Sequence, residues 1–293
     1  MSGHASVLLD EALALLAVRG GGFYVDGTLG LGGHAEAILE QSAPDGPLLG
    51  VDKDGESLEH ARARLARFQS RVELVQADFR EIPRLLGGRR ADGILLDLGM
   101  SSLQLDSAER GFSFQQDGPL DMRMDRSAGR SASELVNQAS PSQLADLIHD
   151  YGEEPHARRI ARAIVEARRH ARIRTTAELA AIVRRTAFRS RKGKDPATRT
   201  FQALRIAVNG ELERLGDAIA ELARCLAQEG RLAVIAFHSL EDREVKQSFR
   251  ALAGQGYRVL TKKPLRPGET ETRKNPRARS ARLRALQRLA EAA

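Results

Sequence analysis

The sequence predicts an α/β fold in which strands and helices alternate around a mainly parallel sheet and an all-helical insertion interrupts the alternation. Two observations predict it. Four short apolar runs each end in an aspartate, and the alternation stops after residue 98 and resumes at residue 231. The four runs span residues 22–26, 47–52, 72–78 and 93–97. Parallel strands would bring their terminal aspartates together at the carboxyl edge of the sheet, where open α/β sheets bind ligands.

The charge of these strand ends predicts the kind of ligand. The four terminal residues are Asp26, Asp52, Asp78 and Asp97. An edge with four carboxylates repels a pyrophosphate and attracts a cation. S-adenosylmethionine is positively charged at its sulfonium and amino groups, so it suits this edge better than NAD or ATP. One such aspartate alone is commonly a turn or capping residue, whereas the four together favour the ligand interpretation.

A glycine-rich loop follows the first strand. Residues 26–34 read Asp-Gly-Thr-Leu-Gly-Leu-Gly-Gly-His and precede a predicted helix over residues 35–41. Glycines permit a tight turn and a close approach of the backbone to a ligand. Read from Gly30, the loop also satisfies the dinucleotide pattern G-x-G-x-x-A, with Asp52 near the ribose-binding position, so a dehydrogenase is an alternative. Asp26 favours a ligand with an ammonium group instead, because it would repel a pyrophosphate.

The remaining elements follow in order along the chain. Apolar spacing is helical from about residue 133 to residue 188, which predicts the insertion, and a loop at 190–198 returns the chain to the core. Residues 201–228 are predicted to form one long helix closed by Gly230, because apolar residues recur along one face. Strands are then predicted at 231–237 and 256–260. The predicted domains are the first part of the core at 1–106, the substrate-recognising insertion at 107–196, and the second part of the core with a basic C-terminal segment at 197–293.

Composition and charge restrict the class of protein. With 293 residues and Cys225 as its single cysteine, the chain has no disulfide scaffold, and no His pair or acidic trio has the spacing of a metal site. The amino-terminal residues lack a basic signal region, and no apolar run approaches the about 20 residues that span a bilayer. We therefore expect a cytoplasmic protein without membrane contact.

Positive charge is concentrated in two regions. The chain has 46 Lys and Arg against 39 Asp and Glu, a net charge of +7 and a pI of about 10.0. The cations gather at 158–194 and 262–284, where Arg outnumbers Lys. Arginine suits phosphate recognition, so we predict a nucleic-acid partner, with solvated helix faces as the alternative.

Seven blocks of sequence, in order, resemble the RsmH (MraW) family of bacterial 16S rRNA cytosine-N4 methyltransferases. They are residues 26–34, 97–102, 110–114, 120–124, 197–205, 237–243 and 275–280. The resemblance covers nearly the whole chain. It implies a Rossmann-like, seven-stranded methyltransferase sheet interrupted by a helical domain. It also implies a S-adenosylmethionine (SAM)-dependent enzyme that methylates the exocyclic amine of a cytosine in the decoding region of 16S rRNA, with that rRNA or the small ribosomal subunit as partner.

The resemblance further implies a set of cofactor-binding residues. They are Gly32, Gly33, His34, Asp52, Phe79, Asp97 and Gln104. In this set Asp52 would accept both ribose hydroxyls, Phe79 would pack on adenine and Asp97 would lie near the methionine end. The chain departs from the family at Leu103, where proline is frequent, and at Gly210, where an acidic residue is usual.

The chemistry can be narrowed from the residues themselves. Methylation of pyrimidine carbon 5 needs a cysteine nucleophile, and Cys225 is predicted to lie inside a helix, in a packing role. The remaining mechanism is direct attack by a nitrogen or oxygen of the substrate on the methyl group.

Residues that could orient a cytosine amine are therefore the catalytic candidates. They are Asp97, Ser101, Ser102 and His238. Amino-methyltransferases usually carry an Asp/Asn/Ser-Pro-Pro-aromatic motif near the first three, and it is absent here. A structural role is equally expected for His238, and is favoured for His4, which could reach the cleft only if the amino-terminal segment folds over it. A ribosome assembly factor that binds SAM without turnover is the alternative function.

Overall fold

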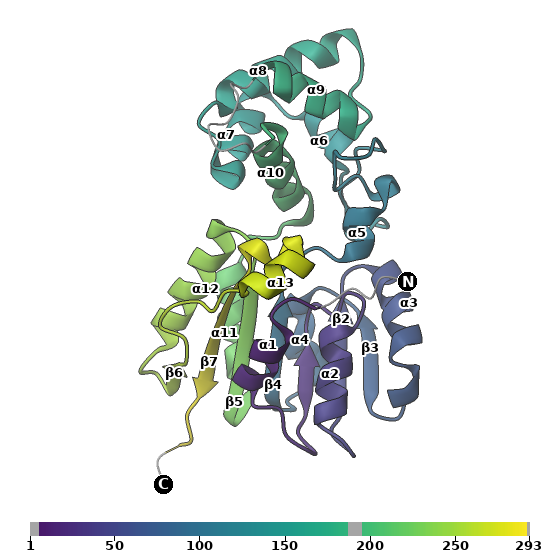
Figure 1. The fold of residues 1–293 in the computed structure, drawn as a ribbon. Coiled ribbons are helices and arrows are strands. Elements are labelled where there is room, and N and C mark those ends of the chain that lie inside the picture. Colours follow the sequence, from purple (N-terminus) through teal and green to yellow (C-terminus); the bar gives the residue numbers. More distant parts are fainter. Residues whose placement is uncertain (1–5, 187–194, 292–293) are drawn as a thin grey trace. The chain divides into compact units, whose positions relative to one another are not determined.

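The structure is a computed structural model that describes residues 6–186 and 195–291. It consists of two compact units (Figure 1). The first unit combines Met1–Ser101 with Arg214–Ala293, and the second is Ser102–Glu213. The second unit therefore interrupts the first in the sequence. The predicted α/β fold class is confirmed, and the predicted insertion at 107–196 lies inside the second unit.

A seven-stranded sheet forms the centre of the first unit, in the order β3-β2-β1-β4-β5-β7-β6. The strands are β1 (Tyr24–Asp26), β2 (Leu48–Asp52), β3 (Val72–Gln76), β4 (Ala91–Asp97), β5 (Leu226–Ala236), β6 (Tyr257–Val259) and β7 (Arg282–Arg288). Strands β1 to β5 are parallel, and β7 is antiparallel to both of its neighbours. The four aspartate-bearing runs are thus adjacent parallel strands, as predicted.

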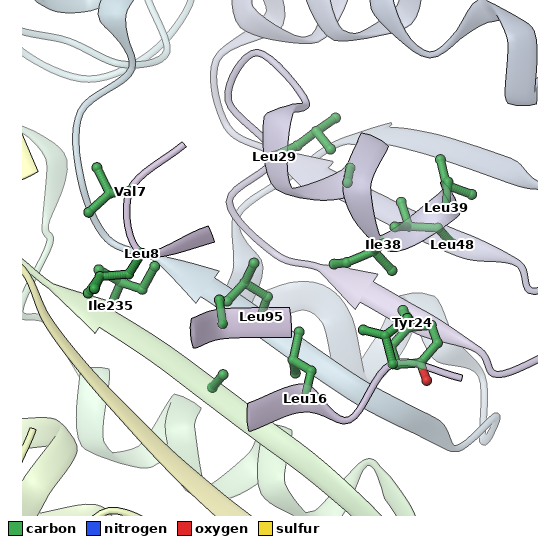
Figure 2. Close-up of a cluster of buried hydrophobic side chains, with 14 of the residues drawn as sticks. Val7, Leu8, Leu16, Tyr24, Leu29, Ile38, Leu39, Leu48, Leu95 and Ile235 are labelled. Carbon is green, nitrogen blue, oxygen red and sulfur yellow. The ribbon is translucent and has the colours of Figure 1, made fainter. Parts of the chain in front are cut away.

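Helices cover both faces of this sheet (Figure 1). One face carries α1 (Leu9–Leu16), α2 (Gly33–Gln41) and α3 (Gly55–Arg64), and the other carries α4 (Ile82–Leu86), α11 (Leu215–Arg224) and α12 (Ser239–Leu252). The shorter helices are η1 (Ala66–Phe68), η2 (Phe79–Glu81), α13 (Glu269–Lys274) and η4 (Pro276–Ser280). Figure 2 shows the core beneath the first face, where Leu16, Ile38 and Leu95 meet. Leu96, the next residue along β4, faces the opposite way, toward Ile82. Burial on both faces explains why these strands read as continuous apolar runs.

The described residues of the second unit form helices and connecting loops. The helices are α5 (Ser102–Asp106), η3 (Ala108–Arg110), α6 (Ala132–Gln138), α7 (Pro141–Gly152), α8 (Ala157–His170), α9 (Thr176–Thr186) and α10 (Ala197–Asn209). Capping boxes at Ser131 and Ser140 begin α6 and α7, because each hydroxyl accepts a backbone N–H of the first turn. The helical periodicity predicted for residues 133–188 is confirmed through residue 186.

Two of the family-like blocks, 110–114 and 120–124, pair with each other. The N–H of Met122 donates to the carbonyl of Arg110 at 3.0 Å. The buried Arg110 guanidinium donates to the carbonyls of Arg123 and Met124 at 3.1 and 3.0 Å. Asn209, at the end of α10, accepts the N–H of Met124 and donates to the carbonyl of Met122, both at 2.8 Å. These blocks therefore build one hydrogen-bonded loop on α10.

The single long helix predicted for residues 201–228 is wrong. The chain instead forms α10, a turn, α11 and the beginning of β5. Gly210 has a left-handed φ of 62°, which ends the helical conformation of α10. Glycine adopts this φ easily because it has no β-carbon. Gly230 lies within β5, and Cys225, predicted inside the helix, is the residue between α11 and β5.

Strand β7 was not predicted, because its sequence Arg-Leu-Arg-Ala-Leu-Gln-Arg reads as charged. Arg284 is 6% exposed, and its Nε donates to Asp242 at 2.7 Å. Arg282 also lies 3.4 Å from Asp242. The expectation that Arg284 contributes to a nucleic-acid surface is therefore wrong, because this side chain fastens α12 to the sheet.

Candidate functional site

Three buried or partly buried carboxylates lie at the carboxyl ends of β1, β2 and β4. Asp26 is 1% exposed and accepts the N–H of Thr28 at 3.3 Å. Burial raises the pKa of Asp26 to about 7, and the charges of Asp97 and Asp52 contribute to the rise. The hydroxyl of Thr28 in turn accepts the N–H of Asp97, which links the ends of β1 and β4. The edge therefore carries acidic groups whose ionised forms are destabilised until a cation approaches.

Asp52 binds the glycine loop through one carboxylate oxygen and the turn before α3 through the other. One oxygen accepts the N–H of Gly30 at 2.6 Å, and the other accepts the N–H of Asp54 at 2.8 Å. Burial raises the pKa of Asp52 to about 6, and these two hydrogen bonds oppose the rise. A backbone hydrogen bond from Lys53 also lowers this pKa. A carboxylate offers about four acceptor sites, so acceptor capacity remains for a hydroxyl donor of a ligand.

One left-handed residue and two close contacts favour glycine in the loop. Gly32 precedes α2 with a φ of 77°, a conformation that side chains rarely adopt. A β-carbon on Gly33 would lie 2.2 Å from the hydroxyl oxygen of Ser6, and one on Gly27 would lie 2.6 Å from Leu96 Cδ2. The amino-terminal segment thus passes directly over the first residue of α2.

His34 links that segment to the carboxylates. Its ring lies between the carbonyl of Val7, 3.0 Å from Nε2, and Asp97 Oδ2, 3.8 Å from Nδ1. A carbonyl only accepts, so we assign the proton to Nε2. The side chain of His34 is 8% exposed, and burial lowers its pKa. Burial raises the pKa of Asp97, and the nearby His34 opposes this rise. The neutral imidazole therefore leaves the negative charge at this edge uncompensated.

Asp78 differs from the other three aspartates. It follows β3 by two residues, caps η2 together with Glu81, and forms an ion pair with Arg80 at 2.9 Å. Lys53 lies 3.6 Å from the same carboxylate. Asp78 is therefore already paired with cations and adds less to the field at the edge. Phe79, the next residue, has the Arg80 guanidinium 4.7 Å from its ring centroid, which occupies one ring face.

His238 is the residue before α12 and follows the end of β5 by two residues. Its Nδ1 accepts the N–H of Glu241 at 3.3 Å, so Nδ1 carries a lone pair and the neutral ring carries its proton on Nε2. The Glu241 carboxylate accepts the N–H groups of Phe237 and His238 at 2.8 and 3.2 Å. His238 Nε2 lies 3.0 Å from Glu241 Oε1. His238 therefore caps the N-terminus of α12. Because Nε2 carries the proton of the neutral ring, it can donate a hydrogen bond but cannot act as a general base.

The other predicted residues have separate positions. The hydroxyl of Ser101 lies 3.5 Å from that of Ser57 in the first unit. Ser102 and Gln104 belong to α5 of the second unit, where they are 9% and 4% exposed. Within the described ranges, Ser102 Oγ has no hydrogen-bond partner. His4 lies outside the described residues.

The structure thus brings Gly32, Gly33, His34, Asp52, Phe79, Asp97, Ser101 and His238 into the first unit. Sequence reasoning missed Ser6 and Val7, because a small polar and an apolar residue carry no motif. It also missed Glu241, whose position three residues after His238 is a capping-box signal.

Cys225 is partly buried, and burial raises the pKa of its thiol. At neutral pH the thiol is therefore protonated and weakly nucleophilic. This agrees with a packing role rather than a role in covalent chemistry.

None of the helices in residues 6–186 and 195–291 is both long and apolar enough to cross a bilayer.

A family model described as the MraW methylase family matches residues 1–289. The chain is 52% identical to the ribosomal RNA small subunit methyltransferase H of Syntrophus aciditrophicus (strain SB), with 98% of each chain covered. It is 51% identical to the protein of that name from Geotalea uraniireducens (strain Rf4), again with 98% of each chain covered. For Syntrophobacter fumaroxidans the identity is 49%, over 97% of this chain and 96% of the relative.

Proposed function

This chain belongs to the MraW methylase family, and we propose that it transfers a methyl group from SAM to the N4 amine of a cytosine in small-subunit rRNA. The observation that carries the proposal is the set of carboxylates at the ends of β1, β2 and β4 beside a neutral histidine on a glycine loop. The substrate class comes from the names of the relatives, which are ribosomal RNA small subunit methyltransferases.

The residues at this edge fit SAM by charge. Burial raises the pKa values of Asp26, Asp52 and Asp97, so the ionised carboxylates lack compensating charge. A ligand with an ammonium and a sulfonium group supplies that charge, whereas the pyrophosphate of a dinucleotide would add repulsion. The family match and this electrostatic argument together favour a methyltransferase over the dehydrogenase alternative.

Each residue of the first unit then has a distinct binding role. Asp52 accepts the ribose hydroxyls with the acceptor sites that Gly30 and Asp54 leave open. The adenine stacks on the face of Phe79 opposite Arg80. The methionine end lies beside the glycine loop, toward Asp97, where the φ of 77° at Gly32 sets the path of the backbone.

The bound cofactor supplies an electrophilic methyl group, and the residues of the chain orient its acceptor. A cytosine amine is a weak nucleophile because its lone pair is delocalised into the ring. Hydrogen bonds from the amine to Asp97, with Ser101 as a second acceptor, hold the nitrogen toward the methyl group and favour localisation of the lone pair. His238 Nε2 is buried and faces Glu241 Oε1 at 3.0 Å, so we assign His238 the capping of α12 rather than a contact with the base.

The second unit binds the RNA backbone in this proposal, and the described cations divide into two groups. Arg184 donates twice to Asp195, at 3.0 and 2.8 Å, so its charge is paired. The outer face of α8 and the residues after it expose Arg158, Arg162 and Arg172. These cations face solvent and would neutralise phosphates. Arg189, Arg191, Lys192 and Lys194 lie outside the described residues. A substrate of this class places the enzyme in the cytoplasm.

Methyl transfer in vitro tests the proposal. The purified protein is incubated with isotopically labelled SAM and small ribosomal subunits from cells that lack the gene, and the rRNA nucleosides are analysed by mass spectrometry. We expect labelled N4-methylcytosine from the wild type, a strong reduction with Asp97→Asn, and full activity with the exposed control Asp45→Asn. An assembly factor without turnover would bind SAM and subunits but leave no label.

A further inference from the structure

The amino-terminal residues Ser6, Val7 and Leu8, which we call the strap, connect the glycine loop to the carboxyl-terminal part of the chain. The strap touches the loop twice, through the close approach of Ser6 to Gly33 and through the carbonyl of Val7, which accepts from His34 Nε2 at 3.0 Å. On its other side, the N–H of Leu8 donates to Glu271 Oε1 at 2.8 Å, across 263 residues of sequence. The strap is therefore fastened between the loop and α13.

The conformation of the strap depends on these contacts. Leu8 is fully buried and adopts left-handed torsion angles, φ 51° and ψ 39°, which are unfavourable for a residue with a β-carbon. Such a conformation persists only when the surroundings enforce it. Glu271 provides one enforcing contact, since its carboxylate accepts the one N–H of Leu8.

Glu271 belongs to α13, whose own residues are not buried, but the chain after this helix enters the core. The carbonyl of Glu271 accepts the N–H of Asn275. Ala278 and Ala281, which follow in and just after η4, are fully buried in the same core cluster as Val7 and Leu8. Glu271 thus lies on a segment that leads into the core, and its carboxylate fixes the direction of the Leu8 N–H.

We propose that Glu271 is a positioning residue for cofactor binding. By holding Leu8 it fixes the carbonyl of Val7, which keeps the proton of His34 on Nε2 and the ring beside Asp97. Loss of the Glu271 contact leaves the buried N–H of Leu8 without this acceptor, so the strained backbone of the strap shifts and the hydrogen bond between the Val7 carbonyl and His34 weakens. This inference rests on the proposed function, because it concerns the site assigned to SAM.

Three variants on one helix test the proposal. Glu271→Ala removes the acceptor, and Glu271→Gln keeps an acceptor oxygen without the charge. Glu269→Ala is the matched control, because Glu269 is 87% exposed and pairs with Arg273 of the same helix. Titration calorimetry should show the SAM dissociation constant about tenfold higher for Glu271→Ala, the loss expected for a charged hydrogen bond. Glu271→Gln should recover most of the affinity, and Glu269→Ala should match the wild type. The KM for SAM should rise in Glu271→Ala, with kcat changed less than about twofold.

Two spectroscopic readouts separate positioning from a general loss of stability. The 15N shifts of the His34 ring should report one tautomer, protonated on Nε2, in the wild type and a mixture in Glu271→Ala. In the wild type itself, saturation with SAM should slow hydrogen exchange of the Leu8 amide, because two coupled events stabilise each other reciprocally. This last measurement needs no variant and stays decisive if Glu271→Ala does not fold.

The outcomes distinguish this inference from the proposed function. If the wild type binds SAM, but Glu271→Ala equals Glu269→Ala in affinity and in the His34 shifts, Glu271 has no positioning role. Exchange at Leu8 that is indifferent to SAM overturns the inference as well. If the wild type does not bind SAM at all, the proposed function fails first.

Discussion

Replacing Asp52 with alanine tests whether this carboxylate binds the ribose of the cofactor. In the structure Asp52 accepts the backbone N–H groups of Gly30 and Asp54, has a further backbone hydrogen bond from Lys53, and retains acceptor capacity for the ribose. Hydrogen bonds to a charged acceptor contribute about 1.5–3 kcal/mol, so Asp52→Ala should weaken SAM binding about 10- to 150-fold. Titration calorimetry measures the loss, and Glu59→Ala, an exposed change on the adjacent helix α3, should leave the affinity unchanged.

A modified ligand separates ribose binding from loop distortion, because Asp52→Ala also releases Gly30 and Asp54. S-adenosylhomocysteine and its 2′-deoxy analogue are compared on both proteins. If Asp52 binds the ribose, the penalty of Asp52→Ala shrinks for the analogue, because the wild type has already lost that contact. An equal penalty for both ligands would show that Asp52 only holds the loop.

The pH dependence of SAM affinity provides a third test of the role of Asp52. The pKa of Asp52 is raised to about 6, and the ligand prefers the ionised form. Affinity should therefore increase as the pH rises through 6, by about tenfold between pH 5 and pH 8 from this group, and the increase should be absent in Asp52→Ala. Asp26, with a pKa of about 7, should give a second rise that both proteins retain. Identical pH profiles for the two proteins would refute the assignment.

Three further predictions concern RNA binding, the thiol and the helix break. Joint replacement of Arg158, Arg162 and Arg172 by Gln should weaken RNA binding and leave SAM affinity unchanged. The slope of log affinity against log salt concentration should become shallower by about 2 units. An unaltered slope in filter-binding assays would mean that this face is only solvated. Cys225→Ser should retain near wild-type turnover, because the thiol is protonated and partly buried; abolished activity in a folded variant, seen by nucleoside mass spectrometry, would favour carbon-5 chemistry. Gly210→Ala should lower the free energy of unfolding by about 1 kcal/mol, since φ is 62° there; a denaturant midpoint equal to that of the wild type would contradict this reasoning.

The parallel strands could be predicted from the sequence because their signal is local. Each of β1, β2 and β4 is an apolar run that ends at its aspartate, and the burial of both sheet faces gives these runs their uniform character. The glycine loop was likewise predictable, since tight turns need glycine in a short window. The structure adds that the Ser6 hydroxyl occupies the place of a side chain at Gly33, a contact that no local pattern shows.

Features that depend on distant partners could not be predicted in this way. Strand β7 alternates arginine with apolar residues, and Arg284 is tolerated in the sheet only because Asp242, 42 residues earlier, neutralises it. The long helix was predicted across Gly210 because its apolar spacing continues in α11, although one left-handed residue was enough to end α10. Glu271 carried no signal at all, because its partner is a backbone N–H at the opposite end of the chain.

The central claim is that this chain methylates the N4 amine of a cytosine in small-subunit rRNA. The most direct measurement is nucleoside mass spectrometry of that rRNA from a strain without the gene, compared with the same strain carrying either the wild type or Asp97→Asn. We predict the loss of one methyl group from one cytosine in the deletion strain, its return with the wild type, and little or no return with Asp97→Asn. Unchanged N4 methylation in the deletion strain, or a missing methyl group that belongs to carbon 5, would contradict the account.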